Sequence, residues 1–332
     1  MTNPQITIIG AGAWGTAFAI HLARHNYNVK LWIFEKDLAE QIQKQRINNV
    51  FLPDFELSEN ISPANDIAQT LENAEFVFWA VPTQHLRDIA SIAKNHAANG
   101  AVHCVLGKGI ERQNWQFPFQ ILSSTLNLDD VVVLSGPSFA EEVAQGKPTV
   151  LVAAAKSAEP AQKVQYLVSD EHLRVYRNDD PLGVSLGGAY KNIIAIGTGI
   201  TDGLGLGHNT RAALVTRGLS EIVRFGEAIG AKRETFFGAA GLGDLVLTCT
   251  SEKSRNYSVG FRIGRGETFQ QIASSMMQIA EGVHSTHGVL HIAREHNIEL
   301  PIAIEVHNIL WEGKKPVDGV RSLMSRPLKA EW

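Results

Sequence analysis

The chain has 332 residues, of which 44% are hydrophobic and 19% are charged, and its formal net charge is −4. This composition is typical of folded globular proteins and excludes an intrinsically disordered chain. A small negative charge gives no attraction to nucleic acid or to an anionic membrane surface, so neither is expected as a partner. A chain of this length exceeds one ordinary hydrophobic core, and two domains are expected.

Targeting signals are not evident in the sequence. The first residues, MTNPQ, lead directly into an apolar stretch, without the charged region of a secretion signal. No apolar run reaches the roughly 18 residues that a spanning helix requires. Cys104 and Cys249 match no metal or redox spacing, which fits a reducing compartment. We therefore expect a soluble cytoplasmic protein with no stable membrane insertion.

Apolar segments alternate with helix-length segments in the first half of the chain. The predicted strands are QITIIG, NVKLWIF, EFVFWAV, AVHCVLG, DVVVLSG and TVLVAAA. Most are continuously apolar, as expected for parallel strands that are covered on both faces. Predicted helices between them include 14–26, 83–97 and 140–146. The alternation predicts an α/β fold with an N-terminal doubly wound, Rossmann-type parallel sheet.

The pattern changes after Tyr176, where the polar turn RNDDP ends in a proline. Beyond this turn we predict no strand, only helical periodicity that glycines interrupt. The boundary is placed near Asp180, which gives an N-terminal domain at 1–180 and a C-terminal all-helical domain at 181–332. The helical domain is compatible with a homodimer face, and the oligomeric state stays open.

A glycine-rich motif follows the first predicted strand. Gly10, Gly12 and Gly15 form G-x-G-x-x-G at the start of a predicted helix. The first glycine permits a tight turn, the second lets the backbone approach a pyrophosphate, and the third lets the helix pack against the strand. Amides at the helix N-terminus attract the anion. This position in the first βαβ unit predicts a dinucleotide-binding domain.

The end of the second predicted strand leaves the choice between NAD and NADP open. Glu35 lies about 20 residues beyond the motif, where a carboxylate binds the ribose 2′-hydroxyl and favours NAD. Its neighbour Lys36 can instead pair with a 2′-phosphate and favours NADP. A solvated turn with charges of both signs is the alternative.

Two further loops follow predicted strands, at the sheet edge where ligands of doubly wound folds bind. Lys108 lies between two glycines, and Ser135-Gly136-Pro137-Ser138 forms the second loop. We expect Ser138 to cap the following helix and to leave backbone amides for an anion. An exposed turn lysine and a plain helix cap are the alternatives.

The helical half of the chain carries charges where burial is expected. Lys191 is the one charged residue in LGGAYKNIIAIGTGI, and a buried lysine needs a partner. Desolvation lowers the pKa of a lysine and can turn the amine into a base, whereas a side chain that reaches the surface is the alternative. Asp244 lies in another apolar, glycine-rich run and can provide the partner.

Ser254-Arg255-Asn256 opens a predicted helix. Ser254 can cap it, the free amides and the helix dipole attract negative charge, and Arg255 offers a bidentate fork. This arrangement suits a phosphate monoester, and a capped surface helix is the alternative. His284, His287 and His291 share a helical face by spacing, but no acidic or cysteine ligand is in register. We therefore expect a surface face there and no metal site.

Taken together, these segments resemble the bacterial glycerol-3-phosphate dehydrogenases. The resemblance extends from Ile6 to about Glu281 and rests on GAGAWGTA, Gly-Lys-Gly around Lys108, SGPSFAEE, GGAYKNIIAIG, GLGDL and SRNYSVG, in that order. It implies interconversion of sn-glycerol 3-phosphate and dihydroxyacetone phosphate with NAD(P), which supplies glycerol 3-phosphate for phospholipid synthesis. The alternative is a β-hydroxyacid dehydrogenase of related architecture, with a carboxylate substrate. An inactive NAD(P)-sensing regulator would be expected to lack Lys191 or its partners.

The resemblance also implies roles for individual residues of the substrate-binding and catalytic domain and of the dinucleotide-binding domain. Lys191 becomes the catalytic base. The implied substrate-binding residues are Lys108, Gly136, Ser138, Asp244, Ser254, Arg255 and Asn256. In addition to the glycine motif, the implied cofactor contacts are Ala13, Trp14, Phe34, Lys108, Ala140, Arg255, Ile279 and Glu281. Many relatives carry a basic residue in place of Phe34, which puts strong NADP selectivity in doubt.

Overall fold

The computed structural model describes residues 3–97, 100–276, 280–328 and 330–331. The chain divides into two compact units: unit 1 contains Met1–Lys108 and Gln116–Ser185, and unit 2 contains Gly109–Trp115 and Leu186–Trp332. The division after Ser185 lies close to the boundary proposed near Asp180. The short segment Gly109–Trp115, which the sequence analysis placed in the first domain, is part of unit 2.

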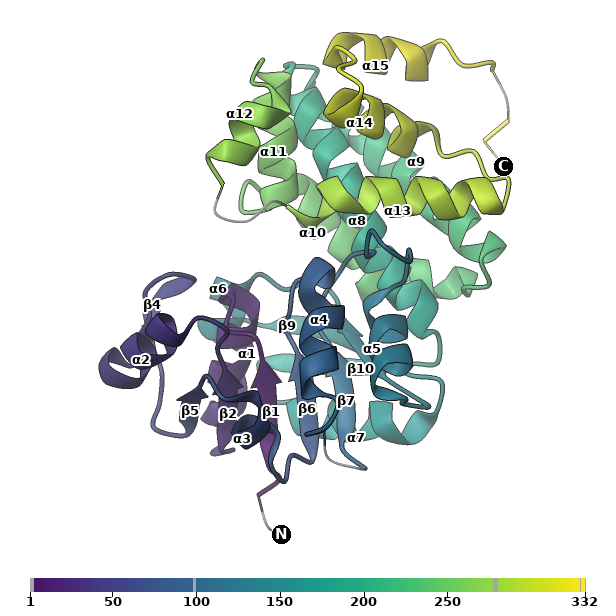
Figure 1. Cartoon of the computed structure of the whole chain (residues 1–332). Helices are drawn as coiled ribbons and strands as arrows, with labels where there is room; N and C mark the ends of the chain where they lie inside the picture. Colours follow the sequence, from purple (N-terminus) through teal and green to yellow (C-terminus); the bar gives the residue numbers. More distant parts are fainter. Residues whose placement is uncertain (1–2, 98–99, 277–279, 329, 332) are drawn as a thin grey trace. The chain divides into compact units, whose positions relative to one another are not determined.

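Unit 1 contains an eight-stranded sheet with the strand order β10-β9-β8-β7-β6-β1-β2-β5 (Figure 1). The strands are β1 (Ile6–Ile9), β2 (Val29–Trp32), β5 (Ile61–Ala64), β6 (Phe76–Trp79), β7 (Val102–Val105), β8 (Val132–Ser135), β9 (Thr149–Ala154) and β10 (Leu173–Asn178). A separate antiparallel pair consists of β3 (Ile47–Asn48) and β4 (Leu52–Glu56).

The predicted parallel sheet is confirmed from β5 to β8, where every neighbouring pair is parallel. It is wrong for β8 and β9, which are antiparallel, although β9 and β10 are parallel to each other. The connection from β8 to β9 contains only the five-residue helix α6 (Ala140–Ala144). Such a helix rises only about 7.5 Å, too little to return the chain to the opposite end of the sheet.

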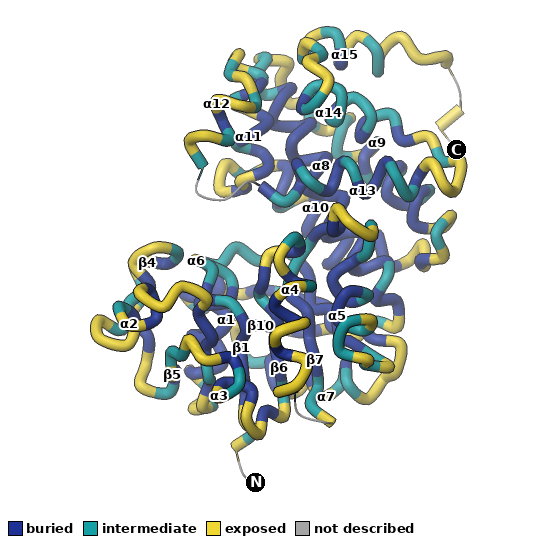
Figure 2. The backbone as a smooth tube through the Cα atoms, in the orientation of Figure 1, coloured by how far each residue is buried: buried dark blue, intermediate teal, exposed yellow. Residues whose placement is uncertain are grey.

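Helices cover both faces of this sheet (Figure 1). One face carries α1 (Ala13–Arg24), α6 and α7 (Ala158–Val168), and the other carries α3 (Ile67–Leu71), α4 (Thr83–Ala93) and α5 (Pro118–Leu126). The helix α2 (Lys36–Gln45) follows β2. The helices predicted at 14–26, 83–97 and 140–146 are confirmed as α1, α4 and α6. Because helices cover both faces, the central strands β1, β6 and β7 are buried (Figure 2).

Unit 2 is helical, and within the described residues no strand follows β10, as predicted. Its helices are α8 (Pro181–Gly203), which begins in unit 1, α9 (Gly207–Ala228), α10 (Asp244–Thr250), α11 (Arg255–Gly264), α12 (Phe269–Ser274), α13 (Glu281–Glu295), α14 (Pro301–Trp311) and α15 (Pro316–Met324). A 3-10 turn (Arg233–Phe237) and a π-helical turn (Ala239–Gly243) lead into α10. None of the residues of α8 is exposed (Figure 2).

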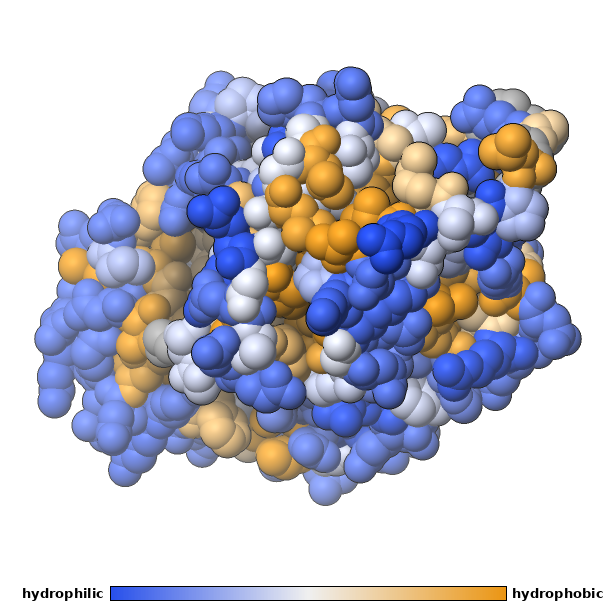
Figure 3. All heavy atoms as spheres, turned by 90° about the horizontal axis from the view of Figure 1, so that it is seen from above, coloured by the Kyte–Doolittle hydropathy of each residue, from blue (hydrophilic) through white to orange (hydrophobic). Residues whose placement is uncertain are grey.

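The outer surface is mixed in character. The face drawn in Figure 3 is largely hydrophilic, and hydrophobic residues form patches on it. Among the helices that the structure describes, none has the length and apolar character needed to cross a membrane.

Glycines allow α8 and α11 to touch backbone to backbone. A Cβ atom at Gly199 would lie 2.1 Å from the carbonyl oxygen of Tyr257, and one at Gly260 would lie 2.0 Å from that of Ile196. Any side chain at these two positions would therefore push the helices apart. Gly197, two residues from Gly199 on α8, differs, because its added Cβ would lie 3.4 Å from the nearest atom, a methyl carbon of Val306.

We expect opposite effects from alanine at these two positions of α8. Gly199→Ala should lower the free energy of unfolding by about 3 kcal/mol, because only a backbone shift can relieve the clash. Gly197→Ala should leave it unchanged or raise it by up to about 1 kcal/mol, the usual helix-propensity gain over glycine. Denaturant unfolding of both variants measures the difference. Equal stabilities would show that the crossing tolerates a wider spacing.

Candidate functional site

The glycine motif has the geometry that its sequence predicts. Gly10 has a φ of +108°, and a Cβ atom there would lie 2.8 Å from the carbonyl oxygen of Ala80. At Gly15, a Cβ would lie 2.0 Å from the carbonyl oxygen of Gly10, so only glycine lets α1 pack this closely. Gly12 caps α1, and a Cβ there would meet no atom within 4 Å. The loop is thus tight at its first and third glycines and open at the second, where a pyrophosphate would approach.

The residues after β2 lie at the same edge of the sheet, because β1 and β2 are parallel neighbours. The side chain of Phe34 is 66% exposed, and its ring packs edge-on against that of Trp32. Glu35 precedes α2 and Lys36 begins it, and both are exposed. Ala13 and Trp14 begin α1, where the Trp14 ring lies 5.8 Å from that of Phe18, centroid to centroid.

Lys108, Gly136 and Ser138 come together at the ends of β7 and β8. Lys108 Nζ donates a hydrogen bond to the Gly136 carbonyl at 3.0 Å, and Ser138 Oγ donates to the same carbonyl at 3.0 Å. Gly136 has a φ of +147°, and a Cβ atom there would lie 2.7 Å from the carbonyl oxygen of Val150. Lys108 therefore joins the two loops that the sequence analysis selected, through a carbonyl that also accepts from Ser138 of its own loop.

The predicted cap at Ser138 is wrong. The residue that caps α6 is Phe139, whose side chain makes no capping bond, and Ala140 is the first helical residue. The helix starts one residue later than expected because Phe139 is still extended, with φ −76° and ψ 133°. The Ser138 hydroxyl is thereby directed back to Gly136.

Lys191 is buried, with 6% of its surface exposed, so the alternative of a surface-reaching side chain is excluded. Its Nζ lies 2.6 Å from Asp244 Oδ1 and 2.8 Å from Thr248 Oγ1. Asp244, the predicted partner, is only 1% exposed. A buried charge of each sign is thus paired and hydrogen-bonded, as burial requires.

Thr248 is a site residue that the sequence analysis missed. Its hydroxyl donates a hydrogen bond to the Asp244 backbone carbonyl at 2.6 Å. A lone pair of Thr248 Oγ1 is therefore available to accept the hydrogen bond from Lys191 Nζ. The spacing of four residues from Asp244 places both on one face of α10 and was the available signal. The adjacent Cys249 is fully buried, and burial raises the pKa of its thiol to about 12, so it stays a neutral neighbour.

The start of α11 is organised as predicted, with a further connection. Ser254 caps the helix by accepting from the Tyr257 amide at 3.2 Å. Asn256 Oδ1 accepts from the Gly282 amide at 3.0 Å, which connects the first turns of α11 and α13. Arg255 is exposed and begins α11.

Two cofactor contacts implied by the resemblance precede or begin α13. Glu281 is half-buried as its first residue, and Ile279 lies outside the described residues. A Cβ atom at Gly282 would lie 2.8 Å from the carbonyl oxygen of Asn192, the residue after Lys191. The start of α13 thereby lies against α8 next to Lys191.

The three histidines of α13 form the predicted solvent-facing surface only in part, since each is partly buried. His287 Nδ1 lies 3.2 Å from His307 Nε2 on α14, and the His291 ring stacks on Trp115 at 4.7 Å. His284 is half-buried. Burial, together with the Arg112 charge, lowers the pKa of His284. This face was misjudged because its partners come from distant parts of the chain.

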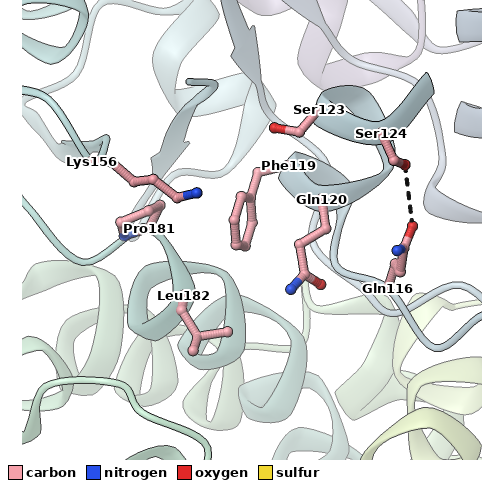
Figure 4. Close-up of a pocket in the computed structure, with 8 residues that line it drawn as sticks. All are labelled: Gln116, Phe119, Gln120, Ser123, Ser124, Lys156, Pro181 and Leu182. Atoms are coloured by element: carbon pink, nitrogen blue, oxygen red, sulfur yellow. Dashed lines mark hydrogen bonds between the residues drawn. The ribbon is translucent and has the colours of Figure 1, made fainter. Parts of the chain in front are cut away.

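Unit 1 also contains a pocket of about 620 Å³ (Figure 4). It is lined by Gln116, Phe119, Gln120, Ser123, Ser124, Lys156, Pro181 and Leu182. In the close-up, the Phe119 ring lies between Lys156 and Pro181 on one side and Gln120 on the other. None of the residues predicted for substrate or cofactor binding lines this pocket.

Comparison with known proteins places these features in a family context. Residues 5–161 match the family described as NAD-dependent glycerol-3-phosphate dehydrogenase N-terminus, and residues 180–321 match the corresponding C-terminus. A glycerol-3-phosphate dehydrogenase (NAD(P)+) of Syntrophotalea carbinolica is 43% identical over 330 residues, which cover 98% of this chain and 99% of the relative. One from Thermoanaerobacter sp. is 43% identical and covers 98% of each chain. The crystal structure of glycerol-3-phosphate dehydrogenase from Coxiella burnetii has a TM-score of 0.94 at 37% identity, covering 98% of this chain and 99% of that one.

Gly12 has free space around it and Gly15 has none, so alanine at the two positions should affect cofactor binding and stability separately. Gly12→Ala should leave the melting temperature unchanged, because its Cβ meets no atom. It should weaken dinucleotide binding at least tenfold, about 1.4 kcal/mol, because the methyl group blocks close approach to the backbone. Gly15→Ala should instead lower the melting temperature, because its Cβ would overlap the Gly10 carbonyl. Thermal unfolding and NADH titration of both variants test this, and unchanged NADH affinity in Gly12→Ala would contradict it.

Proposed function

Because this chain belongs to the NAD-dependent glycerol-3-phosphate dehydrogenase family, we propose that it interconverts sn-glycerol 3-phosphate and dihydroxyacetone phosphate with NAD(P). The buried ion pair of Lys191 with Asp244 is the observation that supports a catalytic role for Lys191. Thr248 accepts a second hydrogen bond from the same ammonium group. A lysine in this environment can exchange a proton with a substrate oxygen.

The nucleotide loop of unit 1 fits a dinucleotide. Space is open above Gly12, and the first amides of α1 follow it. When bound, the dinucleotide supplies or accepts the hydride. The role of the loop is to hold the pyrophosphate through backbone amides and the positive end of the helix dipole.

Lys191 is proposed to move the proton. During reduction of dihydroxyacetone phosphate, its ammonium donates a proton to the oxygen that forms on C2. During oxidation of glycerol 3-phosphate, the neutral amine accepts the proton of the C2 hydroxyl. Asp244 and Thr248 act as positioning residues, since both contact Nζ and limit the directions in which it can turn.

The start of α11 is proposed to hold the phosphate of the substrate. Its support is the capped helix start at Ser254, the guanidinium of Arg255 and the anchored amide of Asn256. Lys108 and Ser138, which both hydrogen-bond the Gly136 carbonyl, are proposed as further substrate-binding residues. The family assignment favours this phosphate ester over the carboxylate of a β-hydroxyacid dehydrogenase, and the intact lysine argues against an inactive regulator.

Three broader parts of the proposal concern the cell. A supply of glycerol 3-phosphate for phospholipid synthesis follows from the reductive direction. A cytoplasmic location is consistent with the composition and with the described helices, of which none could cross a membrane. A homodimer is proposed from the exposed apolar side chains of unit 2, such as Leu206, Val317 and Met324.

Removing the Lys191 amine should abolish turnover. Lys191→Met keeps most of the side-chain volume and should lower kcat by about 10⁴-fold, the upper range for a general acid–base group. It should also lower stability by about 3 kcal/mol, because the buried Asp244 carboxylate loses its ammonium partner. Steady-state kinetics with dihydroxyacetone phosphate and thermal unfolding measure the two effects.

The double variant Lys191→Met with Asp244→Asn separates chemistry from stability. It removes the unpaired carboxylate, so most of the lost stability should return while kcat stays low. A single variant that keeps more than about a tenth of the wild-type kcat, a barrier change under 1.4 kcal/mol, would exclude Lys191 from the mechanism.

Replacing Arg255 should weaken recognition of the phosphate. Arg255→Ala should raise KM for dihydroxyacetone phosphate at least tenfold, because a charge-assisted contact is lost. Unphosphorylated dihydroxyacetone should be a poor substrate and lose little more. Arg265→Ala, at the other end of α11 and also exposed, is the matched control and should behave as wild type. Equal damage to both substrates would assign Arg255 to the cofactor or to the fold.

Both NADH and NADPH should support turnover, because Glu35 and Lys36 favour opposite choices at the adenosine ribose. Glu35→Ala should shift kcat/KM toward NADPH, and Lys36→Ala should shift it toward NADH, each by about tenfold. The kcat/KM values of the two variants with each dinucleotide provide the measurement. A wild-type preference beyond about a thousandfold, roughly 4 kcal/mol, would mean that one of the two residues dominates.

A further inference from the structure

A cluster of metal-binding side chains lies in unit 1 and has no part in the proposed reaction. His21 and His25 lie four residues apart on α1, and Asp170 precedes β10. One atom from each, His21 Nδ1, His25 Nε2 and an Asp170 oxygen, can form a set within 4.8 Å of one another. Among the described residues, this group alone brings three or more histidine, cysteine or carboxylate side chains within this distance.

The distances suit a small tetrahedral ion. Asp170 Oδ2 lies 3.0 Å from His25 Nε2 and 3.8 Å from His21 Nδ1. Ligand atoms around a tetrahedral Zn²⁺ with bonds of about 2.1 Å are about 3.4 Å apart, midway between these two separations. The His25 side chain is 30% exposed, so it has room to make the small rotation that equal spacing requires.

The surroundings orient two of the three ligands. His21 Nε2 lies 2.7 Å from the Val168 carbonyl, which can only accept, so Nε2 carries the proton and Nδ1 keeps its lone pair. The histidine ligands of metal sites usually donate their other ring N–H to a carbonyl or a carboxylate in this way.

The carboxylate is oriented as well. Asp170 Oδ1 accepts from the His172 amide at 2.8 Å and from the Leu173 amide. Hydrogen bonds from two backbone amides favour the ionised form of this carboxylate. Its second oxygen faces both imidazoles as an ionised ligand.

The charges around the cluster act on a cation in both directions. His25 is the C-cap of α1, where the helix dipole favours positive charge. The Arg24 charge disfavours positive charge near His21, but its guanidinium is directed to the carbonyls of Val143 and Ala144 at the end of α6. Its charge is therefore met by carbonyl oxygens there.

We propose that His21, His25 and Asp170 bind one divalent transition-metal ion of the Zn²⁺ class, with water as the remaining ligand on the exposed His25 side. The ion would join the end of α1 to the segment that leads into β10. This role is structural, since none of the three residues belongs to the proposed catalytic or cofactor-binding set, and it does not depend on the proposed function.

The test is a titration of the purified full chain with Zn²⁺ alone, by competition with a chromophoric chelator. The wild type should bind one ion at this site, and His25→Gln should bind it at least about 100-fold more weakly. His96→Gln, which removes an exposed histidine elsewhere in unit 1, is the control and should match wild type. Asp170→Asn should behave as His25→Gln does. His25 is a partly exposed cap residue, so its variant is expected to fold.

Two independent measurements complete the experiment. Saturating Zn²⁺ should raise the melting temperature of the wild type by roughly 5 °C and leave that of His25→Gln unchanged. Co²⁺ in place of Zn²⁺ should give visible absorption bands of a tetrahedral site in the wild type alone. Without added metal, His25→Gln should retain wild-type dehydrogenase activity. Equal Zn²⁺ affinity in wild type, His25→Gln and Asp170→Asn, or no binding by the wild type at micromolar Zn²⁺, would overturn the proposal.

Discussion

The buried ammonium of Lys191 is the constraint on which the organisation of unit 2 depends. A charge removed from water is costly unless a counter-charge and hydrogen bonds go with it, and Asp244 and Thr248 provide them. Because the lysine comes from α8 and its partners from α10, these two helices must hold the pair at a fixed separation. A buried ion pair is seldom more stabilising than an apolar pair of the same volume. Its presence in the middle of a helix without an exposed residue therefore fits a chemical role better than a structural one.

The glycine crossing of α8 and α11 extends this constraint to the proposed phosphate site. At Gly199 and Gly260 the two helices lie so close that no side chain would fit between their backbones. Asn256 then connects the first turn of α11 to that of α13, which touches the carbonyl of Asn192. The start of α11, the proposed phosphate site, is thereby connected through close backbone contact and a hydrogen bond to the helix that carries Lys191. A three-carbon substrate with a phosphate on one carbon and the reacting oxygen on the next requires that the groups binding them stay at a fixed separation, since small misplacements cost much of the rate.

Local patterns explain which features the sequence could predict. Continuous apolar strands and the Gly10–Gly15 motif are properties of short segments, and both were confirmed in the fold. The strand β10 was missed because it is an edge strand that alternates buried Leu173 and Val175 with exposed neighbours. The antiparallel β9 depends on how far α6 can carry the chain, which no residue pattern reveals. Thr248 was missed because a threonine in a helix indicates a site residue only when it is known that Lys191 pairs with Asp244, one turn away on the same helix. In the metal-binding cluster, Asp170 lies 145 positions from His25 along the chain, so the sequence spacing could not reveal it.

The two ends of α1 carry opposite electrostatic character, and this separates their proposed roles. Its first amides, after Gly12, favour an anion, whereas its last carbonyls, near His25, favour a cation. The helix has 12 residues, so these ends are about 18 Å apart. That distance exceeds the screening length of about 8–10 Å at physiological ionic strength, and the dipole effect falls off within one turn. A metal ion at His25 could therefore affect dinucleotide binding at the loop only by fixing the position of α1, not through its charge. Such an influence would change the affinities for NADH and NADPH by the same factor, because it acts on the pyrophosphate that both share and not on the ribose that distinguishes them.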